Sequence, residues 1–112
     1  MFIYHITEEC TWQKALLSGF YLPTAYDVDG FIHCSREDQV IRVADEYYQD
    51  AFDLVLLKIN TRLLETPLIY ENLEKNEEQF PHIYGQLNLN SVIKALPFIK
   101  NETGKYVFPQ YS

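Results

Sequence analysis

The order of hydrophobic and polar residues predicts a strand and then a helix at the start of the chain. Residues 2–7 alternate as a β-strand does, which puts His5 and Thr7 on one face. Thr7 is expected to cap the following helix, because a hydroxyl side chain can accept a hydrogen bond from the unpaired amides of a helix start. Trp12 and Leu16 recur at helical spacing and are expected, with Ala15, to form the buried face of this helix.

A second strand and helix are expected next. Gly19 is expected to end the first helix, since glycine readily adopts the left-handed conformation found at helix ends. Residues 21–29 are polar and rich in turn formers, which predicts a loop and a candidate lid over a binding site. Residues 31–34 predict a short strand, and Ser35 is expected to cap the helix after it. Four residues in that helix recur at helical spacing: Val40, Val43, Ala44 and Tyr47.

The second half of the chain predicts mainly strands. The unbroken apolar run at residues 54–59 is expected to be the central strand of a sheet. The acidic stretch 74–79 predicts a solvated loop. Further strands are expected at residues 68–72, 92–99 and 106–108, with a turn at 101–104 between the last two. Two helices beside several strands indicate a single α+β domain over residues 1–112, with a mostly antiparallel sheet.

Composition and charge narrow the classes of function. The chain has 112 residues, of which 47% are hydrophobic, and a formal charge of −7. No surface for long nucleic acids is expected, because binding phosphate backbones needs clustered lysines and arginines. Cys10 and Cys34 form neither a metal-binding pair nor a disulfide framework, and the sequence shows no signal-peptide pattern and no membrane-spanning apolar run. We therefore expect a cytoplasmic protein that binds a small ligand and no membrane.

All three histidines lie in short motifs flanked by aromatic residues. His5 lies in Phe-Ile-Tyr-His-Ile-Thr, His33 in Gly-Phe-Ile-His-Cys-Ser, and His82 in Phe-Pro-His-Ile-Tyr-Gly. Imidazole suits hydrogen bonding and proton transfer near neutral pH, so we expect the three histidines to line one ligand site. The alternative for each of them is an ordinary half-buried residue. Their spacing is not one that positions metal ligands in advance, so no metal is expected, although three distant segments can still converge in a fold.

Other polar side chains are expected near these histidines. Glu71 lies in an apolar strand, where a carboxylate must be paired or face a cleft; an exposed strand glutamate is the alternative. His82 and Tyr84 point to the same side if their segment is extended. Cys34 is expected to be a small core residue and not a nucleophile, because adjacent strand residues diverge and His33 cannot readily act as its base.

Several of these motifs occur together in a known family. They are Tyr4-His5-Ile6-Thr7, Trp12, Gly19-Phe20, Gly30-Phe31-Ile32-His33-Cys34-Ser35, Tyr70-Glu71 and Phe80-Pro81-His82-Ile83-Tyr84-Gly85. Nearly from end to end, this pattern resembles domain-of-unknown-function family 952, a group of small bacterial proteins. That family has no settled activity, so this resemblance implies a fold more directly than a function.

A more distant resemblance implies chemistry. The first third of the chain is similar to the opening of ADP-ribosyltransferase-type domains and of the related tRNA 2′-phosphotransferases. This likeness implies split antiparallel sheets with two flanking helices and a cleft that holds NAD. By the same likeness, His5 would contact the nicotinamide ribose with support from Thr7, and His33 and Ser35 would lie near the ribose or the phosphates. The stacking partner of the nicotinamide would be one of two tyrosines, Tyr70 or Tyr84.

The leading hypothesis is a cleft that binds NAD or a related nucleotide and is a candidate for ADP-ribose transfer or for hydrolysis of the glycosidic bond. The resemblance implies that Glu71 stabilises the positive charge formed as that bond breaks, with His33 and His82 as further catalytic candidates. One alternative is a non-catalytic nucleotide-binding or protein-interaction module. Another is a metal enzyme with three histidine ligands. The chain's three arginines are fewer than the phosphotransferases use, so transfer of an RNA 2′-phosphate is not expected.

Overall fold

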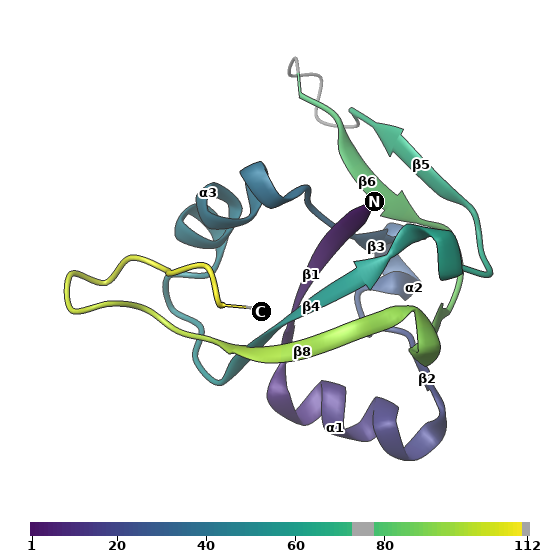
Figure 1. Ribbon diagram of the computed structural model, residues 1–112, viewed down its shortest axis with the longest axis horizontal. Coiled ribbons are helices and arrows are strands. Elements are labelled where there is room, and N and C mark those ends of the chain that lie inside the picture. The colour runs from purple at the N-terminus through teal and green to yellow at the C-terminus, as the bar shows by residue number, and fades with distance from the viewer. Residues whose placement is uncertain (73–77, 111–112) are drawn as a thin grey trace.

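The computed structural model describes residues 1–72 and 78–110, and Figure 1 shows its arrangement of helices and antiparallel strands. The elements in chain order are β1 (Phe2–Glu8), α1 (Glu9–Ser18), β2 (Phe20–Tyr21), α2 (Tyr26–Asp29), β3 (Ile32–His33), α3 (Glu37–Tyr47), β4 (Leu54–Asn60), the 3-10 helix η1 (Thr61–Leu63), β5 (Leu68–Glu71), β6 (Phe80–Ile83), β7 (Leu87–Asn88), the 3-10 helix η2 (Leu89–Ser91) and β8 (Val92–Phe98). The predicted mixture of helices and antiparallel strands is confirmed, with the short helix α2 added to the two that the pattern predicted.

The main sheet has the strand order β1-β4-β8, with both strand pairs antiparallel. The apolar run at residues 54–59 forms its central strand, as predicted, because a strand buried on both faces has no need of polar alternation. The two faces of β1 belong to different core clusters, one that contains Ile3 and one that contains Ile6. Helix α1 packs into the first cluster through Trp12, and α3 packs into the second through Val40.

A second sheet has the order β3-β6-β5, also antiparallel, and a two-stranded sheet pairs β2 with β7. A bridge between Tyr4 and Ser35 connects the main sheet to the end of β3, with two backbone hydrogen bonds of 2.8 Å. This bridge brings the chain after β3 against β1. It therefore fixes where α3 starts relative to both sheets.

Both predicted helix caps are wrong. Glu8 occupies the position before α1 and makes no capping hydrogen bond through its side chain, while Thr7 remains inside β1. Arg36 occupies the corresponding position before α3, where its amide donates to Oε1 of Gln39 at 2.9 Å. Ser35 is unavailable as a cap because its backbone oxygen accepts from the Tyr4 amide in the bridge to β1 and not from the first turn of α3. In both places strand pairing extends one residue further than local capping preference predicts.

Several further predictions can be compared with the structure. Gly19 ends α1 in the left-handed conformation, as predicted. Leu16 is exposed, and the buried positions of α1 are Trp12 and Ala15. Residues 106–108 form no strand; Tyr106 only makes an isolated bridge with Lys100 across the predicted turn. Most of the acidic stretch 74–79 lies outside the described residues. Within residues 1–72 and 78–110, no helix is long and apolar enough to cross a bilayer.

Candidate functional site

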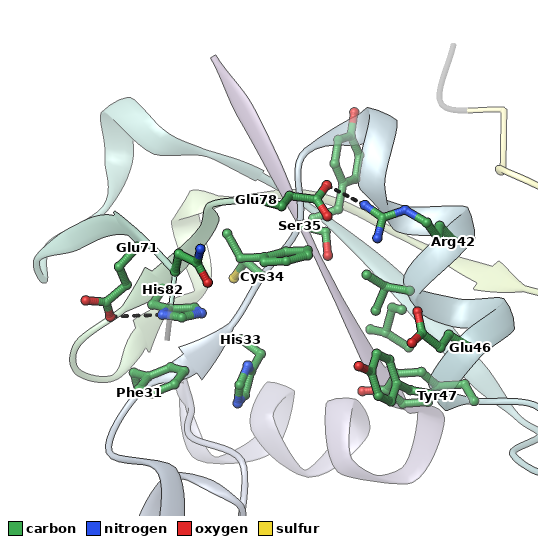
Figure 2. Close-up of a pocket in the computed structure, with 16 residues that line it drawn as sticks. Phe31, His33, Cys34, Ser35, Arg42, Glu46, Tyr47, Glu71, Glu78 and His82 are labelled. Atoms are coloured by element: carbon green, nitrogen blue, oxygen red, sulfur yellow. Dashed lines mark hydrogen bonds and ion pairs between the residues drawn. The ribbon is translucent and has the colours of Figure 1, made fainter. Parts of the chain in front are cut away.

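A cleft of about 600 Å³ lies between α3 and the second sheet, above the face of β1 that carries Tyr4 and Ile6. Figure 2 shows one end formed by Glu71, His82, Phe31 and His33 and the other by Arg42, Glu46 and Tyr47, with Cys34 and Ser35 between them. None of residues 21–29 lines this cleft, so the predicted lid does not cover it in this structure. That segment instead places Tyr21 in the core and forms the short helix α2.

Glu71 and His82 form the polar end of the cleft, and Tyr84, outside the lining, completes a hydrogen-bonded group of three side chains. Antiparallel pairing of β5 with β6 sets Glu71 across from Phe80, and His82 and Tyr84 lie two residues apart on the extended chain that follows. Oε1 of Glu71 accepts a hydrogen bond from Nδ1 of His82 at 2.9 Å and a second one from the Tyr84 hydroxyl. The prediction that His82 and Tyr84 point to the same side is confirmed.

The same contacts set the charge of the group. The Tyr84 and His82 hydrogen bonds hold the pKa of the Glu71 carboxyl below its usual range. The carboxylate in turn raises the pKa of Tyr84 through the same hydrogen bond. Glu71 is therefore ionised at neutral pH, and Tyr84 remains a neutral donor. The side chain of Glu71 is 23% exposed, so the carboxylate sits at the edge of the cleft and not in the core.

The His82 ring is held on two sides. It stacks on Phe31 with a centroid distance of 4.0 Å and an interplanar angle of 23°. Nδ1 faces a carboxylate, which can only accept, so Nδ1 carries the ring proton and Nε2 is the free nitrogen of neutral His82. Among the described residues Nε2 has no hydrogen-bond partner. Every fully buried side-chain nitrogen or oxygen in those residues does have a partner, so Nε2 is not fully buried. Nε2 must therefore reach the surface of the cleft, although His82 as a whole is only 4% exposed.

His33 lies beside His82 because β3 and β6 pair in a register that sets the two residues directly across from each other. The ring centroids are 5.3 Å apart. Nε2 of His33 is 3.2 Å from Oδ2 of Asp29 at the end of α2, and the His33 side chain is 59% exposed. Of the three predicted site histidines, the structure thus brings two together, one shielded and one open to solvent.

His5 takes a different place. It is buried, with Nδ1 2.6 Å from the backbone oxygen of His33 and Nε2 2.7 Å from the hydroxyl oxygen of Tyr21, which also lies 2.9 Å from Oγ1 of Thr7. A carbonyl oxygen only accepts, so Nδ1 donates to it and Nε2 accepts from Tyr21, which leaves Thr7 as the donor to the Tyr21 hydroxyl. Burial lowers the pKa of His5 to about 4, so the ring is neutral at pH 7. Neither His5 nor Thr7 lines the cleft.

The other predicted residues divide in the same way. Ser35 lines the middle of the cleft, whereas Tyr70 and Tyr84 do not line it. Tyr70 packs against the core cluster of Ile3 and its hydroxyl lies 3.7 Å from Sδ of Met1. Cys34 is a buried core residue, as predicted, and burial raises the pKa of its thiol, which disfavours the nucleophilic thiolate.

The far end of the cleft carries residues that the sequence did not single out. Arg42 on α3 pairs with Glu78, which also accepts a hydrogen bond of 3.0 Å from Gln39. Glu46 and Tyr47 lie on the same helix toward its end. The sequence signal of Arg42 and Glu46 was the polar face of a helix, which is the same for a solvated helix and for one that borders a cleft. Tyr47 was predicted to recur with the inner positions of this helix, but it is exposed. Within the described part of the chain, no group of three or more His, Cys, Asp or Glu side chains is placed to hold a metal ion.

Comparison with known proteins agrees with this fold. The family described as "Protein of unknown function (DUF952)" matches residues 6–95. The chain belongs to this family. No curated protein matches the chain significantly.

Three solved structures, all of protein CC0527 from Caulobacter crescentus, are similar to this chain over nearly its whole length. One X-ray structure is 26% identical, with a TM-score of 0.85, and covers 96% of this chain and 94% of that chain. The X-ray structure of a double mutant is 25% identical with a TM-score of 0.84 and the same coverage. The solution NMR structure is 27% identical with a TM-score of 0.82, and covers 93% and 90% of the two chains. None of these names states an activity, so they support the fold and leave the function to the site.

Proposed function

We propose that the cleft binds NAD or a related nucleotide and that the protein transfers ADP-ribose from it or hydrolyses its glycosidic bond. One observation carries this proposal: an ionised carboxylate, Glu71, and the stacked aromatic pair of Phe31 and His82 line the same end of the cleft. A nicotinamide bound to ribose is a flat cation, so it can stack on an aromatic ring and is attracted by a carboxylate. The ADP-ribosyltransferase likeness of the sequence belongs to this proposal.

The size and lining of the cleft fit such a substrate. Its volume of about 600 Å³ is within the range of about 300–1,000 Å³ usual for small-molecule sites. The Ser35 hydroxyl has no hydrogen-bond partner among the described residues and, by the argument used for His82, reaches the cleft as a donor for ribose or phosphate oxygens. Arg42 is the cation of the lining, but it pairs with Glu78. We place the cationic nicotinamide end at Glu71 and the diphosphate toward Arg42, where the phosphate oxygens would take the place of the Glu78 carboxylate.

Glu71 then stabilises the transition state. As the bond between ribose and nicotinamide breaks, positive charge moves from the ring onto the ribose, and a fixed carboxylate favours that state. Both hydrogen bonds to Glu71 end on Oε1, so they orient the carboxylate and leave Oε2 available to the substrate. His5 and Thr7 support the site from below in this proposal, because His5 holds the backbone of His33. They do not contact the nucleotide.

The proposal is tested by adding NAD and then ADP-ribose to isotopically labelled protein and following NMR shifts, together with an assay for released nicotinamide. Shifts are expected around Phe31, Glu71 and His82. Glu71→Gln should bind ADP-ribose within a few-fold of the unsubstituted protein and release nicotinamide about 100-fold more slowly or worse, the usual loss when one charge-stabilising group is removed. Glu65→Gln is the matched control, since Glu65 is exposed and does not line the cleft.

Two results would change the conclusion. Binding of NAD and ADP-ribose without any release of nicotinamide would make the protein a non-catalytic nucleotide-binding module. An absence of shifts at millimolar ligand would refute the nucleotide proposal altogether.

A metal enzyme with the three histidines as ligands would need His5, whose two ring nitrogens are already hydrogen-bonded to the protein.

A further inference from the structure

We infer that His82 is the general base of this site and that the acceptor is therefore one that must lose a proton, such as water or a hydroxyl group. This inference rests on the proposed function and adds to it the residue that takes the proton and the class of nucleophile. Glu71 becomes a positioning residue for His82 as well as the charged group at this end of the cleft, and Tyr84 orients Glu71 from outside the lining.

The geometry of His82 is that of an oriented base. Glu71 fixes the ring proton on Nδ1, and Phe31 holds the plane of the ring by stacking. In the neutral ring Nε2 then carries the lone pair, without a protein partner in the described residues, and open to the cleft. In Figure 2 the ring lies between the Glu71 carboxylate and His33, so the free nitrogen is turned away from the carboxylate. A carboxylate behind an imidazole also stabilises the imidazolium that forms when Nε2 accepts a proton.

The surroundings of His82 favour this base over other candidates. The groups that face it are Glu71 on β5, Tyr84 directly after β6 and His33 on β3, with Asp29 behind His33. His33 is bonded to Asp29 through Nε2 and is mostly exposed, which suits it to pass protons to solvent and not to hold a shielded nucleophile. The thiol of Cys34 is buried and protonated.

The proton balance then specifies the nucleophile. The nucleophile's O–H proton moves to Nε2 of His82 while its oxygen bonds to the ribose carbon. The bond from that carbon to nicotinamide breaks, and its electron pair neutralises the pyridinium nitrogen, so nicotinamide leaves as a neutral molecule that needs no acid. The imidazolium returns its proton to solvent past His33. A carboxylate acceptor would need no base, so a built base indicates an acceptor whose nucleophilic atom carries a proton, with water and hydroxyl groups as the simplest members of that class.

Imidazole rescue tests the role of His82. In His82→Ala, nicotinamide release at neutral pH should fall by about 100-fold or more, a typical contribution of a general base. Added imidazole should restore at least a tenth of the lost rate, whereas pyrrole, a ring of the same size without a basic nitrogen, should restore none. ADP-ribose binding is measured by NMR in parallel. His82→Gln, which keeps most of the side-chain volume, should remain folded, bind ADP-ribose and lose the rate.

The possible results separate the two proposals. If the unsubstituted protein binds ADP-ribose and releases no nicotinamide, the catalytic proposal is refuted, and so is the role of His82 as its general base. If release is present and His82→Gln keeps the full rate and the same pH profile, the proposed function stands and the role of His82 is overturned. Equal rescue by imidazole and pyrrole would show that the ring is needed for packing only.

Discussion

The pH dependence of stability gives a quantitative test of where the chain places His5. Burial lowers its pKa from the ordinary 6.5 to about 4. Between these values the unfolded chain binds a proton that the folded protein does not, so the free energy of unfolding rises with pH. At 1.36 kcal/mol per unit of pKa shift, the lowered pKa of His5 corresponds to about 3 kcal/mol in the free energy of unfolding. This stability is fully present above pH 6.5 and is lost as the pH falls toward 4. About 2 kcal/mol of it should be lost between pH 7 and pH 5.

The assay compares urea unfolding of the unsubstituted protein and of His5→Gln at several pH values between 7 and 5. Glutamine can keep both hydrogen bonds of the ring, donating to the His33 backbone oxygen and accepting from Tyr21, but it does not titrate. The variant should therefore show a pH dependence that is weaker by about 2 kcal/mol over this range. The carboxylates titrate alike in both proteins and cancel in the comparison. Equal pH dependence of the two proteins, or an NMR titration of the His5 ring near 6.5, would refute the buried placement.

Two further predictions concern backbone strain and thiol reactivity. Gly85 has φ 145°, and a Cβ added there would lie 2.5 Å from Cγ2 of Thr66, so Gly85→Ala should lower the free energy of unfolding by about 2–3 kcal/mol. Gly30→Ala, at φ 78° with open space around it, should cost about 1 kcal/mol in the same denaturant experiment, and equal costs would contradict the contact. A thiol reagent at neutral pH should modify the exposed Cys10 quickly and the buried Cys34 only after unfolding. Two fast thiols in the native protein would show that the second is not buried.

Local pattern was enough for parts of the fold and of the candidate site. Alternation along β1 separated its two faces correctly, and the apolar run of β4 indicated a strand buried on both sides. Spacing by two residues was also enough to predict that His82 and Tyr84 share a side, since this follows from extended backbone alone. The family match over residues 6–95 confirms the resemblance that the motifs carried.

The convergence of these segments was decided by long-range pairing. His33 meets His82 because β3 and β6 pair in one particular register, and a register between strands about 50 residues apart is set by the whole core. Long-range pairing also decides the place of His5. Its ring is hydrogen-bonded to the Tyr21 hydroxyl and the His33 carbonyl, and these groups lie beside it only when β1, β2 and β3 come together.

The caps and the far end of the cleft show the same division. Thr7 and Ser35 have the chemistry of helix caps, but strand pairing and the bridge to β1 use their backbones first. Arg42 and Tyr47 border the cleft only because α3 packs on β1 and thereby faces the second sheet on the other side of the cleft. The sequence by itself determined the periodicities, the faces and the residue types available for chemistry. Tertiary structure decided which of those residues meet, because burial and hydrogen bonding between distant strands outweigh local preferences of about 1 kcal/mol each.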